Sequence, residues 1–178
     1  MSTKFSRTAF YKELESSLAT DTGPQRKAWA KTIVDQDVDI ASLSGLLKSD
    51  PTTSMHFRWL LSDVGLLEPK KLFSALPFLL EFFENHDPDF KHSIANWWLI
   101  AGIPPEHEGK AINLSFQWLQ SSDTQVTTKS RSIWILQQLS KKYPDIKNEL
   151  KLCLKEQKDK YSEDFRKRAV KVLKELEK

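Results

Sequence analysis

Two tryptophans of this chain, Trp59 and Trp134, have charged or polar side chains one helical turn away. His56 and Asp63 flank Trp59, and Arg131 precedes Trp134 by three positions. Residues three or four positions apart share one face of a helix. Flat aromatic rings interleaved with arginine are typical of binding surfaces, because Trp and Arg bury a large area for little entropy. They can also stack on bases or hold a cation. These residues indicate recognition rather than a reaction.

A cluster of candidate metal ligands lies at one predicted turn, His86-Asp87-Pro-Asp89-Phe-Lys-His92. The two aspartates are better explained as helix caps, because an Asp carboxylate accepts hydrogen bonds from the free N–H groups of a first turn. The spacing matches no known zinc site. We therefore predict no metal site.

Catalytic motifs do not stand out either. His107-Glu108 lacks the second histidine of a zincin helix, and the chain has no Walker loop, dinucleotide fingerprint or nucleophile elbow. Cys153, the single cysteine, lies on an apolar stripe and is predicted to be an inert buried thiol. An internal disulfide is excluded. The sequence predicts no catalytic residue and no cofactor.

The elements that position these residues follow from one stretch that the chain repeats, residues 87–102. Asp87 and Pro88 suit the first turn of a helix, an apolar stripe follows at the helical period, and Gly102 suits the end. Similar stretches begin at Asp50-Pro51 (closing at Gly65), at Asp123 and at Ser162. Self-similarity at a fixed period of this size is the signature of a stacked repeat protein.

Turn chemistry predicts ten helices and an all-α fold. Seven of the eight prolines lie at predicted helix starts, which supports the segmentation. The helices are expected over residues 5–19, from Asp21–Pro24 onward, from Asp37 or Asp39 through 40–47, and over about 51–65, 69–85, 88–102, 105–121, 124–142, 144–158 and 162–177.

Pro77 is the exception, because it lies inside a predicted helix. Leu76-Pro77-Phe78-Leu79-Leu80, followed by Asp87 at the turn and Lys91 early in the next helix, resembles the HEAT repeat. The resemblance implies a right-handed α-α superhelix, one repeat domain over residues 1–178. Its helix pairs would be 5–36, 38–66, 69–102, 105–142 and 144–177. It also implies that two sets of residues hydrogen-bond between neighbouring repeats: Asp50, Asp87 and Asp123, and Lys91, Lys129 and Arg166.

From Ala111 onward the chain also resembles a group of small bacterial HEAT-like proteins, some of which carry the name adenylosuccinate lyase. Lyases of that superfamily use a Ser- and Gly-rich catalytic loop, and nothing like that loop occurs in this sequence. We therefore do not expect lyase activity.

In HEAT-like stacks the second helix of each pair lines a concave groove. Aligning these helices on their apolar stripes predicts a ligand-binding set: His56, Trp59, Asp63, Asn96, Arg131, Trp134, Arg168 and Lys171. Trp59 and Trp134 each leave the apolar stripe of their own helix. The other four tryptophans are expected in the core: Trp29, Trp97, Trp98 and Trp118.

The function that we expect is a non-catalytic scaffold that binds a protein or peptide in this groove. One alternative rests on the resemblance to HEAT-like DNA alkylation-repair glycosylases, which use a Trp and an Asp one turn apart. Trp59 and Asp63 have that spacing, Trp134 would be a further aromatic, and the carboxylate would stabilise positive charge on the sugar. The helix between them offers Asn96 and Trp98 where an Arg would be expected. A second alternative is a structural protein that dimerises through its outer faces.

Charge and composition limit the kinds of partner that we expect. Residues 141–178 hold 13 Lys/Arg against 8 Asp/Glu, which can favour an anionic partner or simply keep a terminal helix pair soluble. The sequence has neither a signal-peptide pattern nor an apolar run of the ~20 residues that cross a bilayer. We expect a cytoplasmic protein without membrane contact, a monomer or weak homodimer, with nucleic acid a less favoured partner.

Overall fold

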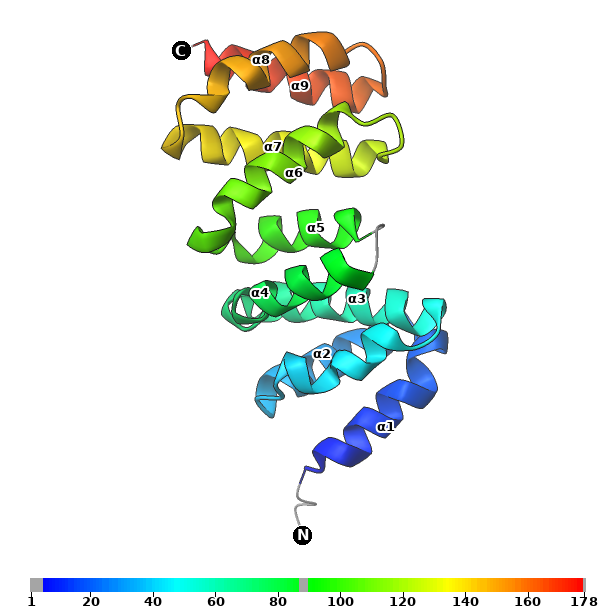
Figure 1. The fold of residues 1–178 in the computed structure, drawn as a ribbon. Helices are drawn as coiled ribbons and strands as arrows, with labels where there is room; N and C mark the ends of the chain where they lie inside the picture. Colours follow the sequence, from blue (N-terminus) through cyan, green and yellow to red (C-terminus); the bar gives the residue numbers. More distant parts are fainter. Residues whose placement is uncertain (1–4, 87–89, 178) are drawn as a thin grey trace. The chain divides into compact units, whose positions relative to one another are not determined.

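Every regular element in the described part of the chain, residues 5–86 and 90–177, is a helix (Figure 1). This computed structural model therefore confirms the all-α prediction. The nine α-helices in these residues are α1 (Arg7–Ser17), α2 (Gly23–Asp35), α3 (Pro51–Leu67), α4 (Pro69–His86), α5 (Lys91–Ala101), α6 (Glu108–Gln120), α7 (Val126–Lys142), α8 (Ile146–Gln157) and α9 (Glu163–Leu176). Three 3₁₀ helices join them: η1 (Leu18–Thr20), η2 (Ile40–Lys48) and η3 (Pro105–His107).

Proline and side-chain caps set several helix starts, as predicted. Pro51 and Pro69 are the first residues of α3 and α4, where a missing N–H costs nothing. The Asp50 carboxylate accepts hydrogen bonds from the backbone N–H groups of Thr52 and Thr53 at 3.0 and 3.1 Å. The predicted start at Asp87 and Pro88 lies outside the described residues.

The start of α7 differs from the prediction. The helix begins at Val126, and its N-cap, Gln125, makes no side-chain capping bond. Asp123 instead accepts a hydrogen bond from the Ser122 hydroxyl at 3.0 Å, because a short Asp side chain competes for local donors in a turn. The first turn of α7 is therefore left without a side-chain cap.

The two glycines expected to end helices behave differently. Gly102 follows the last residue of α5 and has φ 97°, a left-handed conformation that suits a helix end. Gly65 was expected to end its helix, but α3 continues to Leu67. A methyl group at Gly65 would collide with the side chain of Leu72, so glycine is needed there for close packing against α4.

The described helices fall into two compact units. Unit 1 comprises Met1–Phe82 and Ile100–Gly102, and unit 2 comprises Phe83–Leu99 and Ile103–Lys178. In unit 1, α3 packs against α2, η1 and η2. Trp29 is 4% exposed there, and its indole N–H donates to the Glu13 carboxylate at 2.7 Å. The expected single repeat domain over residues 1–178 stays a prediction.

In unit 2, α6 packs against α7 and α8 packs against α9 (Figure 1). Aromatic, aliphatic and Cys153 side chains from these four helices form one core. Trp98 stacks on Trp118 with ring centroids 5.9 Å apart, and Trp97 is also buried. The core positions predicted for Trp29, Trp97, Trp98 and Trp118 are thus confirmed. Burial raises the pKa of the Cys153 thiol, as expected for an inert cysteine.

Lys129 corrects an expectation drawn from the HEAT resemblance. It was expected to bond to a neighbouring repeat. Instead its Nζ is fully buried and donates to the backbone oxygens of Trp118, Leu119 and Ser121 at 3.3, 2.9 and 2.5 Å. These carbonyls belong to the end of α6, whose negative dipole end and free acceptors favour a cation. Lys129 therefore joins α6 to α7 within one helix pair.

Two other members of those sets, Arg166 and Asp50, also have local contacts. Arg166 lies 3.8 Å from Asp159 and 3.9 Å from Glu163. Asp50 caps its own helix, and Asp87 lies outside the described residues. No helix in residues 5–86 or 90–177 is long and apolar enough to cross a membrane.

Candidate functional site

Seven of the eight predicted ligand-binding residues fall into two groups, one in each unit. In unit 2, Trp134 is partly buried on α7, and two cations of α9 lie over its ring. The Arg168 Cζ is 5.3 Å and the Lys171 Nζ is 5.7 Å from the ring centroid, within cation–π range. The structure thus brings together three of the predicted residues. We call Arg131, Trp134, Arg168 and Lys171 the cationic surface.

Arg131 precedes Trp134 by one turn of α7 and is anchored to α5. Its Nη1 donates to the His92 backbone oxygen at 3.2 Å and lies 3.0 and 2.9 Å from the two ring nitrogens of His92. Burial lowers the pKa of the Arg131 guanidinium, because its charge is partly removed from water. A poorly solvated cation gains most from an anionic ligand.

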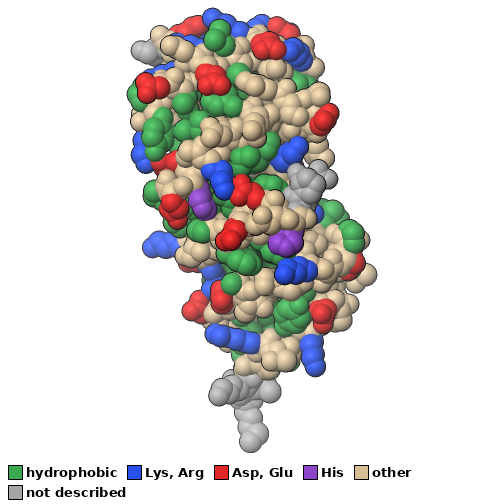
Figure 2. All heavy atoms as spheres, in the orientation of Figure 1, with side chains coloured by type: hydrophobic (Ala, Val, Ile, Leu, Met, Phe, Trp, Pro, Cys, Tyr) green, Lys and Arg blue, Asp and Glu red, His purple; other side chains and the backbone are tan. Residues whose placement is uncertain are grey.

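No Asp or Glu among the described residues forms an ion pair with Arg131, Arg168 or Lys171. The other cations of α9 that form ion pairs do so locally, as Lys167 does with Glu163 at 4.0 Å. On the face in Figure 2, Lys and Arg side chains are mixed with Asp and Glu. The cationic surface therefore gathers, beside one tryptophan, cations that have no ion-pair partner within the described ranges.

A pocket of about 290 Å³ lies beside the cationic surface, between the first halves of α7 and α9. We call it the α7–α9 pocket. It is lined by Val126, Thr127, Ser130, Arg131, Ser162, Asp164, Phe165 and Arg168. Arg131 and Arg168 belong to both places. Arg168 lies over Trp134, and its Nη1 also donates to the Ser130 backbone oxygen at 3.4 Å.

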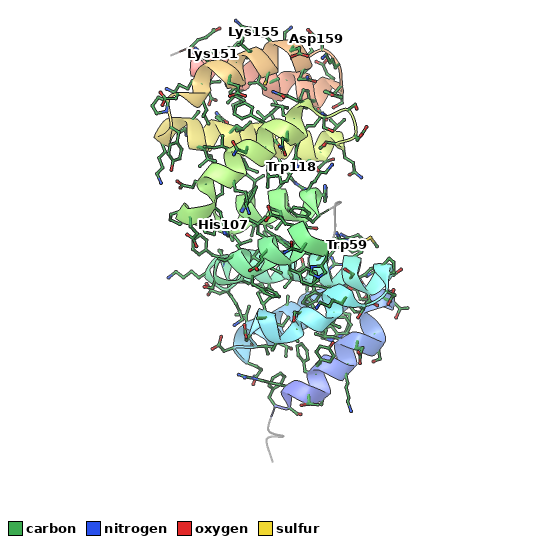
Figure 3. The ribbon with its side chains drawn as sticks, in the orientation of Figure 1. Trp59, His107, Trp118, Lys151, Lys155 and Asp159 are labelled. Carbon is green, nitrogen blue, oxygen red and sulfur yellow. The ribbon has the colours of Figure 1, made fainter. Side chains whose placement is uncertain are left out.

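In unit 1, His56, Trp59 and Asp63 line one side of α3, and Trp59 is 44% exposed (Figure 3). The His56 and Trp59 ring centroids are 4.7 Å apart. Arg26 of α2 lies with its Cζ 5.6 Å from the Trp59 ring and its Nε 2.7 Å from Asp63 Oδ2. His56 Nδ1 is 2.7 Å from Oδ1 of Asp21, whose side chain is 1% exposed.

This network compensates the charge of Asp63. The glycosylase alternative needs a carboxylate available to stabilise positive charge on a substrate. Here the nearest cation is already Arg26, in a contact with charge-assisted hydrogen-bond geometry. The pairing weakens that alternative, which stays a prediction. Asn96 is partly buried on α5 in unit 2.

Sequence reasoning missed Arg26, Asp21 and His92 as members of these groups. A signal was present, because each lies about one repeat from its partner. Arg26 and Asp63 are 37 positions apart, Asp21 and His56 are 35, and His92 and Arg131 are 39. Extending the alignment to the first helix pair would have placed Arg26 and Asp21 near α3.

The cluster of candidate metal ligands between His86 and His92 is only partly described. Its two aspartates, Asp87 and Asp89, which were predicted to cap a helix, lie outside the described residues. Within residues 5–86 and 90–177, no three His, Cys, Asp or Glu side chains are placed to hold a metal ion. Models of known protein families, curated proteins and solved structures offer no match to this chain.

Proposed function

We propose that this chain is a HEAT-like repeat protein, an α-α superhelix of five helix pairs. The support is a recurring separation between side-chain partners on different helices. Lys71 and Asp37 are 34 positions apart, Arg26 and Asp63 are 37, and Gln137 and Glu175 are 38. These separations are close to the length of the sequence repeat. Stacked repeats produce such separations, because each repeat contacts only its neighbours.

Its function is to bind an acidic peptide segment of a partner protein on the cationic surface, without catalysis. The observation that carries this proposal is that Arg168 and Lys171 lie over Trp134, with Arg131 one turn earlier on α7. None of these three cations forms an ion pair with an acidic residue in the described part of the chain. Arg is favoured at binding hot spots, and its planar fork matches carboxylates. A peptide rich in Asp or Glu supplies the missing charge.

The placement of Trp134 favours a peptide over single-stranded nucleic acid. Binding of single strands relies on aromatic faces open to stacking bases. Here Arg168 and Lys171 already lie over the indole, at 5.3 and 5.7 Å. The tryptophan therefore holds two cations toward a ligand rather than offering its own face to a base.

Fluorescence anisotropy tests the proposal, with a labelled ten-residue peptide of alternating Asp and Ser. We expect saturable binding to the full chain. Arg168→Gln and Lys171→Gln should each weaken binding by about fivefold, since each removes about 1 kcal/mol of charge-assisted contact. The matched control is Lys155→Gln, which removes the same charge from an exposed position of α8 (Figure 3). It should bind like the parent chain.

Two results would contradict the proposal. One is an equal loss of affinity in all three variants, because binding would then follow net charge rather than the cationic surface. The other is tighter binding of a single-stranded oligonucleotide than of a peptide with the same net charge at two salt concentrations. That result would support a nucleic-acid function, whose phosphate contacts make affinity fall steeply with salt.

A further inference from the structure

The α7–α9 pocket has more hydrogen-bond donors than a carboxylate can use. Two arginines, Arg131 and Arg168, line it from different helices. Three residues that carry hydroxyl groups also line it: Thr127, Ser130 and Ser162. An ionised carboxylate has two acceptor oxygens, whereas a phosphate monoester has three and carries up to two charges. Paired arginines match a phosphate as a rigid fork.

The first turn of α7 adds a further attraction for an anion. The helix is 17 residues long, and its N-cap Gln125 makes no side-chain hydrogen bond. Val126 and Thr127, the first two residues, both line the pocket. Uncapped N–H groups at the positive end of a helix dipole stabilise phosphate. The start of α9 differs, because Ser162 already caps it through the Phe165 N–H at 3.3 Å.

The two arginines are held in place but not satisfied. Nη1 of Arg131 is bonded to His92, and Nη1 of Arg168 to Ser130. No residue in the described ranges accepts a hydrogen bond from the Nε or Nη2 atoms of either side chain. These donors are free for a ligand, and the bonds at Nη1 reduce the entropy that would be lost on binding.

We propose that the α7–α9 pocket binds the phosphate group of a phosphorylated serine or threonine in the acidic peptide. This inference rests on the proposed function and names its ligand more closely. Arg168 would contact both the phosphate and the neighbouring acidic residues, because it lies between the pocket and Trp134. One acidic residue, Asp164, also lines the pocket. Its negative charge repels a phosphate dianion, so replacing Asp164 should increase phosphate affinity, whereas replacing either arginine should decrease it.

The experiment compares two peptides that differ only in one central residue, serine or phosphoserine, by fluorescence anisotropy. For the parent chain we expect the phosphorylated peptide to bind about tenfold more tightly. Arg131→Gln should reduce that preference to twofold or less, and Thr127→Val, at an exposed position of the first turn, to about threefold. Asp164→Asn should increase it, because a like charge is removed. Lys155→Gln should leave it unchanged.

Inorganic phosphate gives a second readout, followed through the backbone amide NMR signals of Val126 and Thr127 in the full chain. Saturable shifts at these amides, lost in Thr127→Val and Arg131→Lys, support the pocket. Arg131→Lys keeps the positive charge, so it replaces Arg131→Gln in this test if the Gln variant does not fold. Equal binding of the two peptides, or a lower preference in Asp164→Asn, overturns the inference.

The outcomes separate this inference from the proposed function. If Arg168→Gln and Lys171→Gln weaken binding of the unphosphorylated peptide but phosphorylation has no effect, the pocket inference fails and the peptide function stands. If neither peptide binds but inorganic phosphate shifts the Val126 and Thr127 amides, the pocket stands and the peptide function fails. If none of these responses occurs, both are wrong.

Discussion

The guanidinium of Arg131 donates a hydrogen bond to the backbone oxygen of His92, 3.2 Å away and 39 positions earlier in the chain. Arg168 makes the corresponding bond to Ser130, 38 positions earlier. Each arginine is thus fixed at one nitrogen by the backbone of a helix about one repeat away. Such anchoring orients the remaining donors before a ligand arrives, which lowers the entropic cost of binding.

Trp134 should act on peptide affinity through the cations that it holds. Trp134→Leu removes the ring beneath Arg168 and Lys171, whose cation–π contacts are each worth about 0.5–1 kcal/mol. We expect about fivefold weaker binding of the acidic peptide, measured by fluorescence anisotropy, and a smaller loss in Trp134→Phe. Trp59→Phe, in unit 1, is the control and should leave the affinity unchanged. Equal affinities of Trp134→Leu and the parent chain would rule out this positioning role.

Lys129 should be among the most destabilising positions to replace with an apolar residue. Lys129→Met keeps much of the side-chain volume but removes the buried ammonium donor that three backbone oxygens at the end of α6 share. We expect the free energy of unfolding to fall by about 3 kcal/mol. Urea denaturation followed by circular dichroism measures it. Lys155→Met, at an exposed site on α8, should change stability by less than about 0.5 kcal/mol. A loss below 1 kcal/mol in Lys129→Met would show that water replaces the donor.

Arg26 should stabilise unit 1 by compensating two carboxylates. Its Nε lies 2.7 Å from Asp63 and its Nη1 3.6 Å from Asp21, whose side chain is only 1% exposed. Arg26→Gln leaves both acids without this cation, and we expect a loss of about 2 kcal/mol. Lys31→Gln is a matched control on the same helix, since its exposed pair with Asp35 contributes little. Equal urea midpoints for the two variants would contradict the prediction.

The Glu108 cluster should make stability depend on pH. Hydrogen bonds from Lys142 at 2.6 Å and Tyr143 at 2.5 Å hold the pKa of Glu108 below its ordinary value. The same contacts raise the pKa of Lys142 and of Tyr143. The depressed glutamate contributes stability above its unfolded pKa, and that stability is lost as pH falls through its folded pKa. The raised groups contribute stability that is lost as pH rises through their folded values.

The measurement is the urea midpoint of Glu108→Gln and of the parent chain from pH 3 to 11. We expect the gap between them to be widest between about pH 5 and 9, between the ordinary values of Glu and Tyr. It should narrow toward both extremes. Glu106→Gln, at an exposed position in η3, is the control and should give a gap that stays small throughout. A gap that widens on acidification would contradict the assignment.

Local chemistry explains why the helices were predictable. Pro51 and Pro69 begin helices and Asp50 caps one, because these effects depend only on the adjacent turn. The buried tryptophans were predictable for a similar reason, since an apolar stripe at the helical period marks the face that packs. The two errors had different causes, packing against another helix at Gly65 and a local hydrogen bond from Ser122 at Asp123. Gly65 lies inside α3 because Leu72 packs against it, and Asp123 does not cap α7.

By itself the sequence determined that the chain is helical, where most helices begin and which tryptophans are buried. These properties depend on side chains within about four positions of one another. Only the tertiary structure decided the partners of the polar residues: Arg26 with Asp63, Arg131 with His92, and Lys129 with the end of α6. Those partners come from other helices, and their meeting depends on how the helices are rotated and offset when they pack. The helical period carries no record of that rotation. The sequence therefore placed Trp134, Arg168 and Lys171 in one predicted set, but only the structure showed that the two cations lie over the indole.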